Sequence, residues 1–232
     1  METSQTDQFL DLPNPKTVTE KDPTIFTVSV IAFNFDLDEI RVLLVKNKKQ
    51  PRKSKERKPP GYGLPTGQLD QNEKMDHAFE RETEQESGYK VTRVVGKLFL
   101  VNKILRTDDG FIPNEIHVFL VETNDCPMKV VEIDEIDASV DPWIPLRQVF
   151  QMPMAQDRNG GNRNPDGIYY MHLKRLYRAI ESMIYSPEDL IDEEAIQKWL
   201  EPNRRALYRV MADLAKEGLL DRFLPPKEEA TV

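Results

Sequence analysis

The stretch "GQLDQNEKMDHAFERETEQESGY", residues 67–89, decides the fold of this chain. Residues 74–86 contain neither glycine nor proline, and their apolar side chains recur at helical spacing, so the stretch predicts a helix there. Gly88 follows the last turn and is the residue type that most readily ends a helix. Glu82 and Glu86 are four residues apart, so we expect both carboxylates on one face of this helix.

Two glutamates one turn apart have an ordinary interpretation, which is the solvated face of a helix. The chemical alternative is a cation site, because like charges at this spacing repel each other unless a cation lies between them. Upstream, "GYGLPTG" ends at Gly67, which lets the backbone approach the helix and offers a carbonyl oxygen. Mg²⁺ prefers such hard oxygen ligands, and a bound cation neutralises a diphosphate and activates a water.

The composition predicts a soluble globular protein, with 232 residues of which 39% are hydrophobic and 31% charged. No apolar run approaches the roughly 20 residues of a membrane helix, and the polar N-terminus lacks the apolar segment of a secretory signal. The single cysteine, Cys126, excludes an internal disulfide framework, and we expect a cytoplasmic protein. A formal net charge of −8 does not favour nucleic acid as a partner.

Along the chain the predicted order is strands, helix, strands, helix, which is typical of a mixed α/β domain. We expect this domain at residues 23–150, after a flexible tail at 1–22 and before a polar loop at 151–170 and a helical extension at 171–232. The strands are expected at residues 24–35, 40–46, 91–105, 115–123 and 128–133, with a turn at 106–114. A basic loop at 47–63 is a candidate flap over an anionic ligand, although a solvated loop explains the same charges.

The spacing within residues 67–89 resembles the Nudix box, G-x5-E-x7-R-E-U-x-E-E-x-G-U, in which U is a bulky apolar residue. The matching residues are Gly67, Glu73, Arg81, Glu82, Glu86 and Gly88, with Thr83 and Tyr89 at the U positions. Gln85 departs from the pattern, because it stands where the family has the first glutamate of its pair; Thr66 and Asn72 are smaller departures. The flanking segments "GYGLP" and "EIDASVDPWIPLRQV" also resemble the family. The resemblance covers residues 24–150 and implies an α/β/α sandwich with a mixed sheet.

The resemblance also implies roles for these residues. Glu82 and Glu86 would be the catalytic and metal-binding carboxylates, with the Gly67 carbonyl and the Gln85 amide oxygen as further ligands of Mg²⁺ or Mn²⁺. We expect Glu86 to face solvent. Glu73 and Arg81 would form a structural ion pair, and Gly88 would end the helix. Some members of the family use a later glutamate as well, and the candidates here are Glu115, Glu122 and Glu132.

The C-terminal region contains amphipathic helical patterns, and its segment "NRRALYRVMADLAKEGLLDRFL" resembles the recognition helix of a winged helix-turn-helix. Residues 171–232 hold ten Lys and Arg against twelve Asp and Glu, however, whereas DNA-binding modules carry a basic surface. We therefore expect a helical extension that packs on the α/β domain or on a second subunit, which would make the protein a homodimer.

The resemblance implies a Mg²⁺-dependent hydrolase that cleaves the diphosphate of a nucleoside diphosphate linked to another group. Its partner would be a nucleotide-type small molecule, and neither a membrane nor nucleic acid is expected. The alternative is a non-catalytic Nudix-like ligand sensor or transcription regulator with a helix-turn-helix-like C-terminal module. Gln85 keeps this alternative open, because an amide oxygen can bind Mg²⁺ but lacks the charge of a carboxylate.

Overall fold

The computed structural model describes residues 24–36, 39–48, 60–107, 110–125, 127–128, 130, 135–156, 164–189, 191 and 193–223. Several predictions fall outside these residues and are not addressed by the structure. They concern the tail at 1–22, residues 49–59 of the basic loop, residues 157–163 of the polar loop, Glu132, and most of the strand expected at 128–133.

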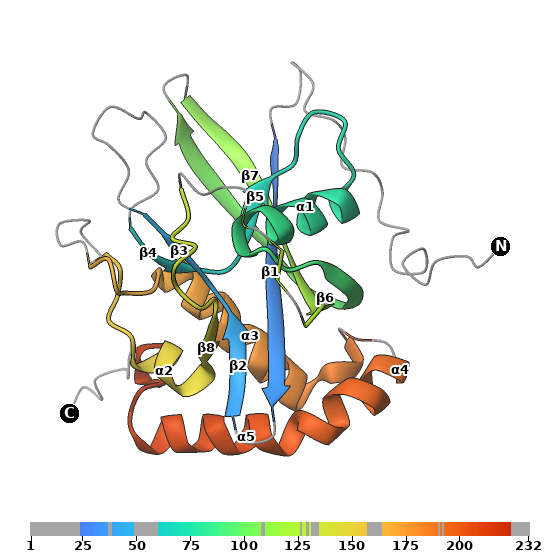
Figure 1. Cartoon of the computed structure of the whole chain (residues 1–232), viewed down its shortest axis with the longest axis vertical. Coiled ribbons are helices and arrows are strands. Elements are labelled where there is room, and N and C mark those ends of the chain that lie inside the picture. The colour runs from blue at the N-terminus through green and yellow to red at the C-terminus, as the bar shows by residue number, and fades with distance from the viewer. Residues whose placement is uncertain are drawn as a thin grey trace, which may run out of the picture.

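One mixed sheet organises the described part of the chain (Figure 1). Its strands run in the order β6-β7-β1-β2-β8, and β5 also pairs with β1. Only β1 and β7 are parallel; the other pairs are antiparallel. The bounds are β1 Ile25–Asp36, β2 Glu39–Leu43, β5 Thr66–Gln68, β6 Val91–Thr107, β7 Gly110–Thr123 and β8 Trp143–Pro145. A separate antiparallel pair consists of β3 Val45–Asn47 and β4 Gly61–Gly63.

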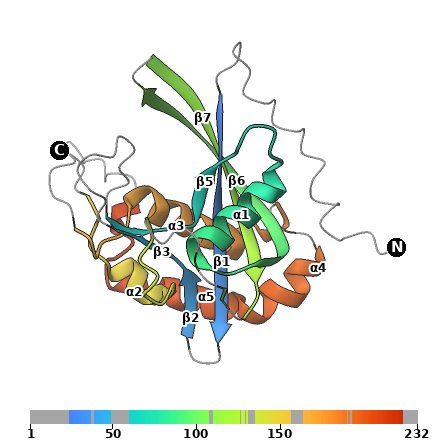
Figure 2. The same cartoon turned by 45° about the horizontal axis from the view of Figure 1, so that its top comes forward.

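Helices cover both faces of this sheet, so the architecture is an α/β/α sandwich (Figures 1 and 2). Helix α1, Met75–Ser87, packs on one face over Val28, Val30 and Phe119. On the other face lies a larger cluster, to which α3, Tyr170–Tyr185, contributes. Because both faces are covered, β1 buries apolar side chains on both, with Val28 and Val30 on one face and Ile31 and Phe33 on the other.

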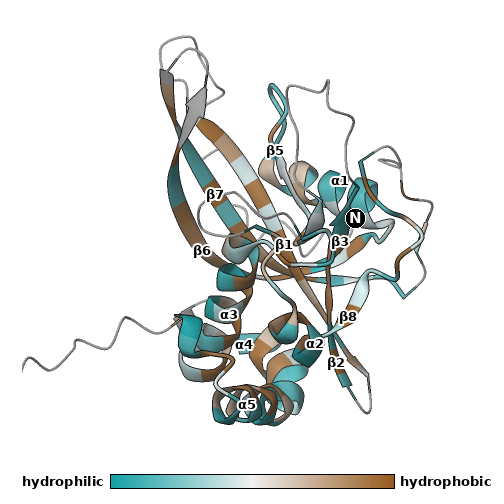
Figure 3. Ribbon diagram, turned by 90° about the vertical axis from the view of Figure 1, so that its left-hand side faces the viewer, coloured by the Kyte–Doolittle hydropathy of each residue, from teal (hydrophilic) through white to brown (hydrophobic). Residues whose placement is uncertain are grey.

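The C-terminal helices belong to this larger cluster. Trp199, in the short π-helix η3 Ile196–Leu200, lies 6.4 Å from Phe33 and 5.1 Å from Phe35 between ring centroids. The helix that follows, α5 Glu201–Lys216, lies at the end of the molecule where β1 ends and β2 begins (Figures 1 and 3). Leu207 and Leu214 of α5 are buried in the same cluster as the sheet residues. The remaining elements are α2 Leu146–Gln151, η2 Pro187–Asp189, α4 Glu193–Ala195 and η4 Asp221–Phe223. The chain therefore has the predicted helical C-terminal region, packed on the α/β layers.

Two predicted strands differ in the structure. The strand expected at 40–46 is divided at Leu44: β2 ends at Leu43, and the chain continues as β3, which pairs with β4 outside the main sheet. The turn expected at 106–114 is shorter, since β7 already begins at Gly110. Pro113 is tolerated within β7 because the pairing of β7 with β1 starts only at Asn114.

Among the described residues, no helix combines the length and the apolar character that crossing a bilayer requires.

Candidate functional site

The buried face of α1 begins with apolar side chains and ends with two carboxylates. Met75 and Phe79 pack against the sheet, and Glu82 and Glu86 continue the same stripe. Only 6% of Glu82 and 2% of Glu86 is exposed. The expectation that Glu86 faces solvent is therefore wrong: the helical repeat of 3.6 residues places it on the packed side of α1.

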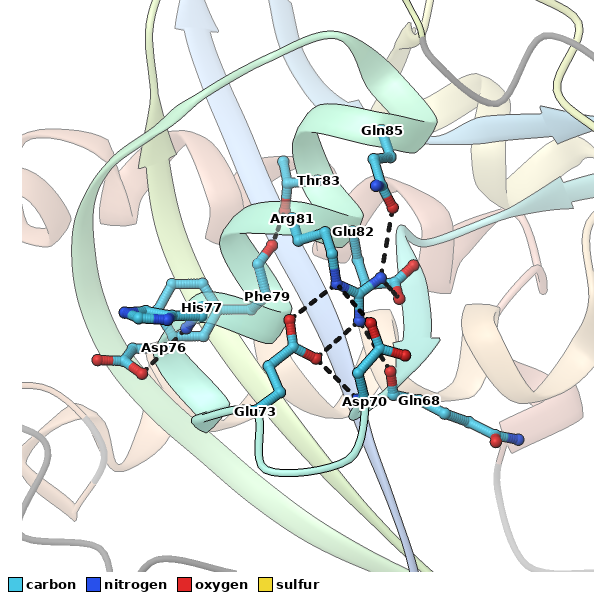
Figure 4. Close-up of polar contacts among 10 residues, drawn as sticks. All are labelled: Gln68, Asp70, Glu73, Asp76, His77, Phe79, Arg81, Glu82, Thr83 and Gln85. Carbon is cyan, nitrogen blue, oxygen red and sulfur yellow. Dashed lines mark hydrogen bonds and ion pairs between the residues drawn. The ribbon is translucent and has the colours of Figure 1, made fainter.

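Arg81 joins this helix to the loop before it (Figure 4). Its Nε donates to Glu73 Oε1 at 2.8 Å, and its Nη2 donates to Glu73 Oε2 at 2.8 Å and to the carbonyl of Gln68 at 2.9 Å. The third nitrogen, Nη1, donates to Glu82 Oε1 at 2.5 Å and to Gln85 Oε1 at 3.3 Å. The ion pair that we expected between Arg81 and Glu73 is thus present, and the same guanidinium also holds Glu82.

These contacts shift the protonation of both partners towards their charged forms. The hydrogen bond from Arg81 is the main cause of the lowered pKa of Glu73. The same bond raises the pKa of Arg81, with a further contribution from Glu82. A bidentate pair of this kind fixes orientation as well as charge, so the loop and the helix are held together in one geometry.

Gly67 lies directly against the carboxylate of Glu82. A Cβ added to Gly67 would lie 1.8 Å from Glu82 Cδ and from Glu82 Oε1. This close approach, and not a left-handed φ, is what favours glycine here, since a Cβ would fit only if the Glu82 carboxylate moved. Gly88 has a different reason to be glycine, since its φ of 79° caps the end of α1.

Glu86 is linked to the opposite layer of the sandwich by a chain of polar contacts. The N–H of Thr66 donates to Glu86 Oε2 at 3.0 Å, and the Thr66 hydroxyl donates to the carbonyl of Leu64 at 2.9 Å. Ser29 Oγ lies 2.9 Å from Thr66 Oγ1, and Arg175 Nη1 of α3 lies 3.4 Å from Ser29 Oγ. The helix that carries Glu86 is therefore connected through the sheet to the C-terminal helices.

The later glutamates are placed among other partners. Glu115 Oε2 lies 3.7 Å from Nε2 of the buried His117, and Glu122 Oε1 lies 4.0 Å from Arg93 Nη1. Glu132 lies outside the described residues. In the described part of the chain, no three or more His, Cys, Asp or Glu side chains are gathered in an arrangement that could hold a metal ion. A cation at this site would therefore need oxygen ligands of other kinds beside Glu82 and Glu86.

Glu86 lines two cavities. The first, of about 300 Å³, lies towards residues 127–128 and 136–142 and is also bounded by Lys46. The second, of about 270 Å³, lies towards the start of α3 and is also bounded by Asn47, Tyr169 and His172. A buried carboxylate in the wall of two cavities can act on a molecule bound in either.

The sequence did not indicate three of these lining residues. Asn47 falls in the expected basic loop, Tyr169 in the expected polar loop and His172 in the expected helical extension, and no motif marks any of the three. Backbone hydrogen bonds bring them together: Tyr169 donates to the carbonyl of Tyr62 at 3.0 Å, and Tyr62 donates to the carbonyl of Gly167 at 2.8 Å. No local pattern predicts pairing across more than 100 residues.

Comparison with known proteins gives one family. The model of the NUDIX domain matches residues 24–163. No curated protein matches the chain.

Solved structures with a similar arrangement come from several bacteria. The NUDIX domain of Shewanella oneidensis NrtR complexed with ADP ribose is 20% identical, with a TM-score of 0.46 over 78% of this chain and 99% of that one. A MutT/nudix family protein from Enterococcus faecalis is 16% identical, with a TM-score of 0.48 over 83% and 71%. A MutT NUDIX hydrolase from Burkholderia pseudomallei is 21% identical, with a TM-score of 0.44 over 67% and 97%.

Proposed function

The chain belongs to the NUDIX domain family, and from that premise we propose that it is a divalent-metal-dependent hydrolase. Its substrate would be a nucleoside diphosphate linked to another group, cleaved at the diphosphate. The observation that carries the proposal is the buried pair Glu82 and Glu86 on one face of α1, with Glu86 in the wall of two cavities. Burying two carboxylates is costly unless a partner or a cation compensates them.

The residues present fit a hard divalent cation such as Mg²⁺ or Mn²⁺. Glu82 and Glu86 supply two carboxylates, and Gly67, whose close approach to Glu82 leaves no room for a Cβ, would supply its carbonyl. Gln85 would add a neutral amide oxygen, although in the structure this oxygen accepts a hydrogen bond from Arg81. The cation would neutralise diphosphate oxygens and activate water.

In the proposed reaction a water oxygen forms a bond to one phosphorus and the bridging P–O bond breaks. The leaving phosphate oxygen keeps the electron pair of that bond, and the water loses one proton. Glu82 and Glu86 are the candidate groups to orient that water and to receive its proton. The products are a nucleoside monophosphate and the phosphorylated partner group.

The test is the release of nucleoside monophosphate or phosphate from a panel of nucleotide conjugates, with Mg²⁺ and with Mn²⁺. We expect Glu86→Gln to lower the turnover number about 10²-fold, the usual order of magnitude for the loss of one electrostatic contact to the transition state. Glu84→Gln is the matched control, because Glu84 lies on the same helix outside its buried stripe. A folded parent that releases nothing from any member of the panel with either cation would overturn the proposal.

A second candidate function is a ligand sensor that regulates a nucleic acid or protein partner. The specific observation that favours it is a groove of about 710 Å³ on the C-terminal helices. Arg205 and Arg209 line this groove beside the exposed rings of Tyr185 and Tyr208. Arginine side chains suit contacts with nucleic-acid phosphates, although Glu201 and Asp213 line the same groove. Binding of duplex DNA that weakens steeply as salt rises, together with no hydrolysis, would select this function over the first.

A further inference from the structure

The cavity between the β3–β4 pair and the start of α3, hereafter the α3 cavity, carries a further inference. It measures about 270 Å³ and is lined by Val45, Asn47, Gly63, Leu64, Thr66, Glu86, Tyr169 and His172. Tyr169 and His172 lie beyond residue 163, where the match to the NUDIX domain model ends. The start of α3 thus lines a cavity that is also lined by Glu86, a residue of the box.

Asn47 is the feature that points to a ligand. Its side chain is buried, with 8% exposed, and its Nδ2 donates to the hydroxyl of Tyr169 at 3.2 Å. Its Oδ1 is also buried and has no hydrogen-bond partner among the described residues. A buried acceptor without a partner is energetically costly, so such atoms are uncommon and need a reason. A ligand group with an N–H or O–H donor would satisfy this oxygen.

The walls of the α3 cavity are held in place. The N–H of Leu64 donates to His172 Nδ1 at 2.9 Å, which fixes the imidazole ring. The rings of Tyr169 and His172 lie 5.6 Å apart between centroids, tilted by 55°. Two fixed rings beside Val45 make an apolar surface suited to the face of another ring.

Without a bound cation, the charge of the lining disfavours a phosphate as the occupant of this cavity. The residues that line the cavity include Glu86 and, among those described, neither lysine nor arginine. The volume lies just below the roughly 300–1,000 Å³ of sites for whole ligands, so it suits one ring of a larger molecule. The occupant expected on these grounds is a neutral ring that carries a hydrogen-bond donor.

We propose that the α3 cavity is the subsite for a neutral ring of the substrate, either the nucleobase or a pentose. Asn47 Oδ1 accepts a hydrogen bond from the ring's amino or hydroxyl group, and Tyr169 and His172 contact its face. Glu86 lies in the same cavity, so the diphosphate attached to the ring would lie beside the two carboxylates of α1. This inference rests on the proposed hydrolase function, and it makes Asn47 and the start of α3 determinants of substrate selectivity.

The first experiment compares the full chain with its Asn47→Leu variant by calorimetry in Mg²⁺, with AMP, ribose 5-phosphate and inorganic pyrophosphate as probes. We expect Asn47→Leu to weaken the binding of a ring-bearing probe at least tenfold and to leave pyrophosphate within about twofold, a tenfold change being about 1.4 kcal/mol. If Asn47→Leu weakens the binding of AMP alone, the ring in the cavity is the base. If it weakens the binding of ribose 5-phosphate as well, the ring is the pentose. Asn102→Leu, at an exposed position of β6, is the matched control.

A second variant keeps the proposal testable if Asn47→Leu does not fold. A Cβ on Gly63 would lie 3.1 Å from Tyr169 Cδ2 and 3.2 Å from His172 Nδ1, so Gly63→Ala narrows the cavity without touching Asn47. On the best substrate of the panel we expect both variants to raise KM at least tenfold while kcat stays within about threefold. Parent-like KM and parent-like affinity for both ring-bearing probes in a folded variant would overturn the subsite and leave the hydrolase standing. A parent that cleaves nothing and binds neither probe would overturn both.

Discussion

Gly67→Ala is the most direct test of how the box is assembled. The new Cβ would lie 1.8 Å from Cδ and Oε1 of Glu82 and 2.1 Å from Glu82 Oε2, well inside van der Waals contact. The backbone itself does not oppose the change, because Gly67 does not have a left-handed φ. Any effect of the substitution therefore comes from displacing the Glu82 carboxylate.

The effects of displacing the Glu82 carboxylate on stability and on metal affinity can be estimated. Glu82 is held by Arg81 Nη1 at 2.5 Å and is 6% exposed, so its carboxylate cannot simply turn into solvent. Overpacking of this kind costs about 1–3 kcal/mol of unfolding free energy. A carboxylate moved away from a bound cation should also lose at least tenfold in metal affinity, which is about 1.4 kcal/mol. A loss of stability alone would leave the metal affinity of the folded protein unchanged, so the two effects can be measured separately.

The assay is a titration of Mg²⁺ and Mn²⁺ by calorimetry, together with urea unfolding at 25 °C. Gly218→Ala is the control, since Gly218 has a φ of 69° and its added Cβ would approach only Asp221 Oδ2, at 3.5 Å. That variant should lose stability through the backbone alone and keep its metal affinity. The double variant Gly67→Ala/Glu82→Asp shortens the displaced side chain, so it should recover stability and show coupling between the two sites.

Two results would refute this reasoning. One is a Gly67→Ala protein with parent-like stability and parent-like metal affinity, because the contact with Glu82 would then have no consequence. The other is strict additivity in the double variant, because the two changes would then act independently. Either result would separate Gly67 from Glu82 and reduce the glycine to a feature of the turn.

Three further predictions concern charges around the site and the sheet. Gln85→Glu should tighten Mg²⁺ binding about tenfold, which is about 1.4 kcal/mol. The cost to stability should be small, because Arg81 Nη1 lies 3.3 Å from Gln85 Oε1 and would face the new carboxylate. Unchanged Mg²⁺ affinity by calorimetry would remove position 85 from the metal site. Arg175→Met should raise the unfolding free energy, measured in urea, by about 1–2 kcal/mol. The reason is the burial of the guanidinium, which lowers the pKa of Arg175 to about 10 and leaves its Nε without a partner among the described residues. A less stable variant would contradict this prediction. Burial, with a smaller contribution from Lys97, lowers the pKa of His117 to about 4, below the unfolded value near 6.5. As pH drops, the unfolded chain therefore binds the proton first, and stability should fall between pH 6.5 and 4. The loss has an upper limit of about 3 kcal/mol. The unfolding free energies at pH 7.5 and 4.5 should differ less in His117→Gln than in the parent, and an equal difference in both proteins would contradict this prediction.

The helix of the box could be predicted from the sequence because its determinants are local. Its length follows from thirteen residues without glycine or proline, its end from Gly88, and the approach of the loop from Gly67. The contact between Arg81 and Glu73 spans only eight residues and was implied by the family resemblance. Each of these features depends on short stretches of chain, where spacing and residue type leave few arrangements.

The rest of the site depends on contacts between distant segments. Asn47 meets Tyr169 across 122 residues, and Leu64 meets His172 across 108. Every box residue precedes Gln151, so the spacing within the box gives no indication of a wall formed by a later helix. In the structure, the start of α3 lines the same cavity as Glu86, and α3 buries its apolar side chains in the cluster of the sheet.

The burial of Glu86 shows how a functional position can be misjudged. Residues 75, 79, 82 and 86 follow the helical repeat, so Glu86 belongs to the buried stripe by spacing alone, but a carboxylate normally belongs outside. The two rules conflict, and sites are where such conflicts are expected, because a side chain needed for chemistry takes a position that packing would give to leucine. The hydrogen bond from Thr66 and the guanidinium of Arg81 compensate part of the cost of burying these carboxylates. A bound cation would add to this compensation, because it would stabilise the two carboxylates that the fold has already withdrawn from water.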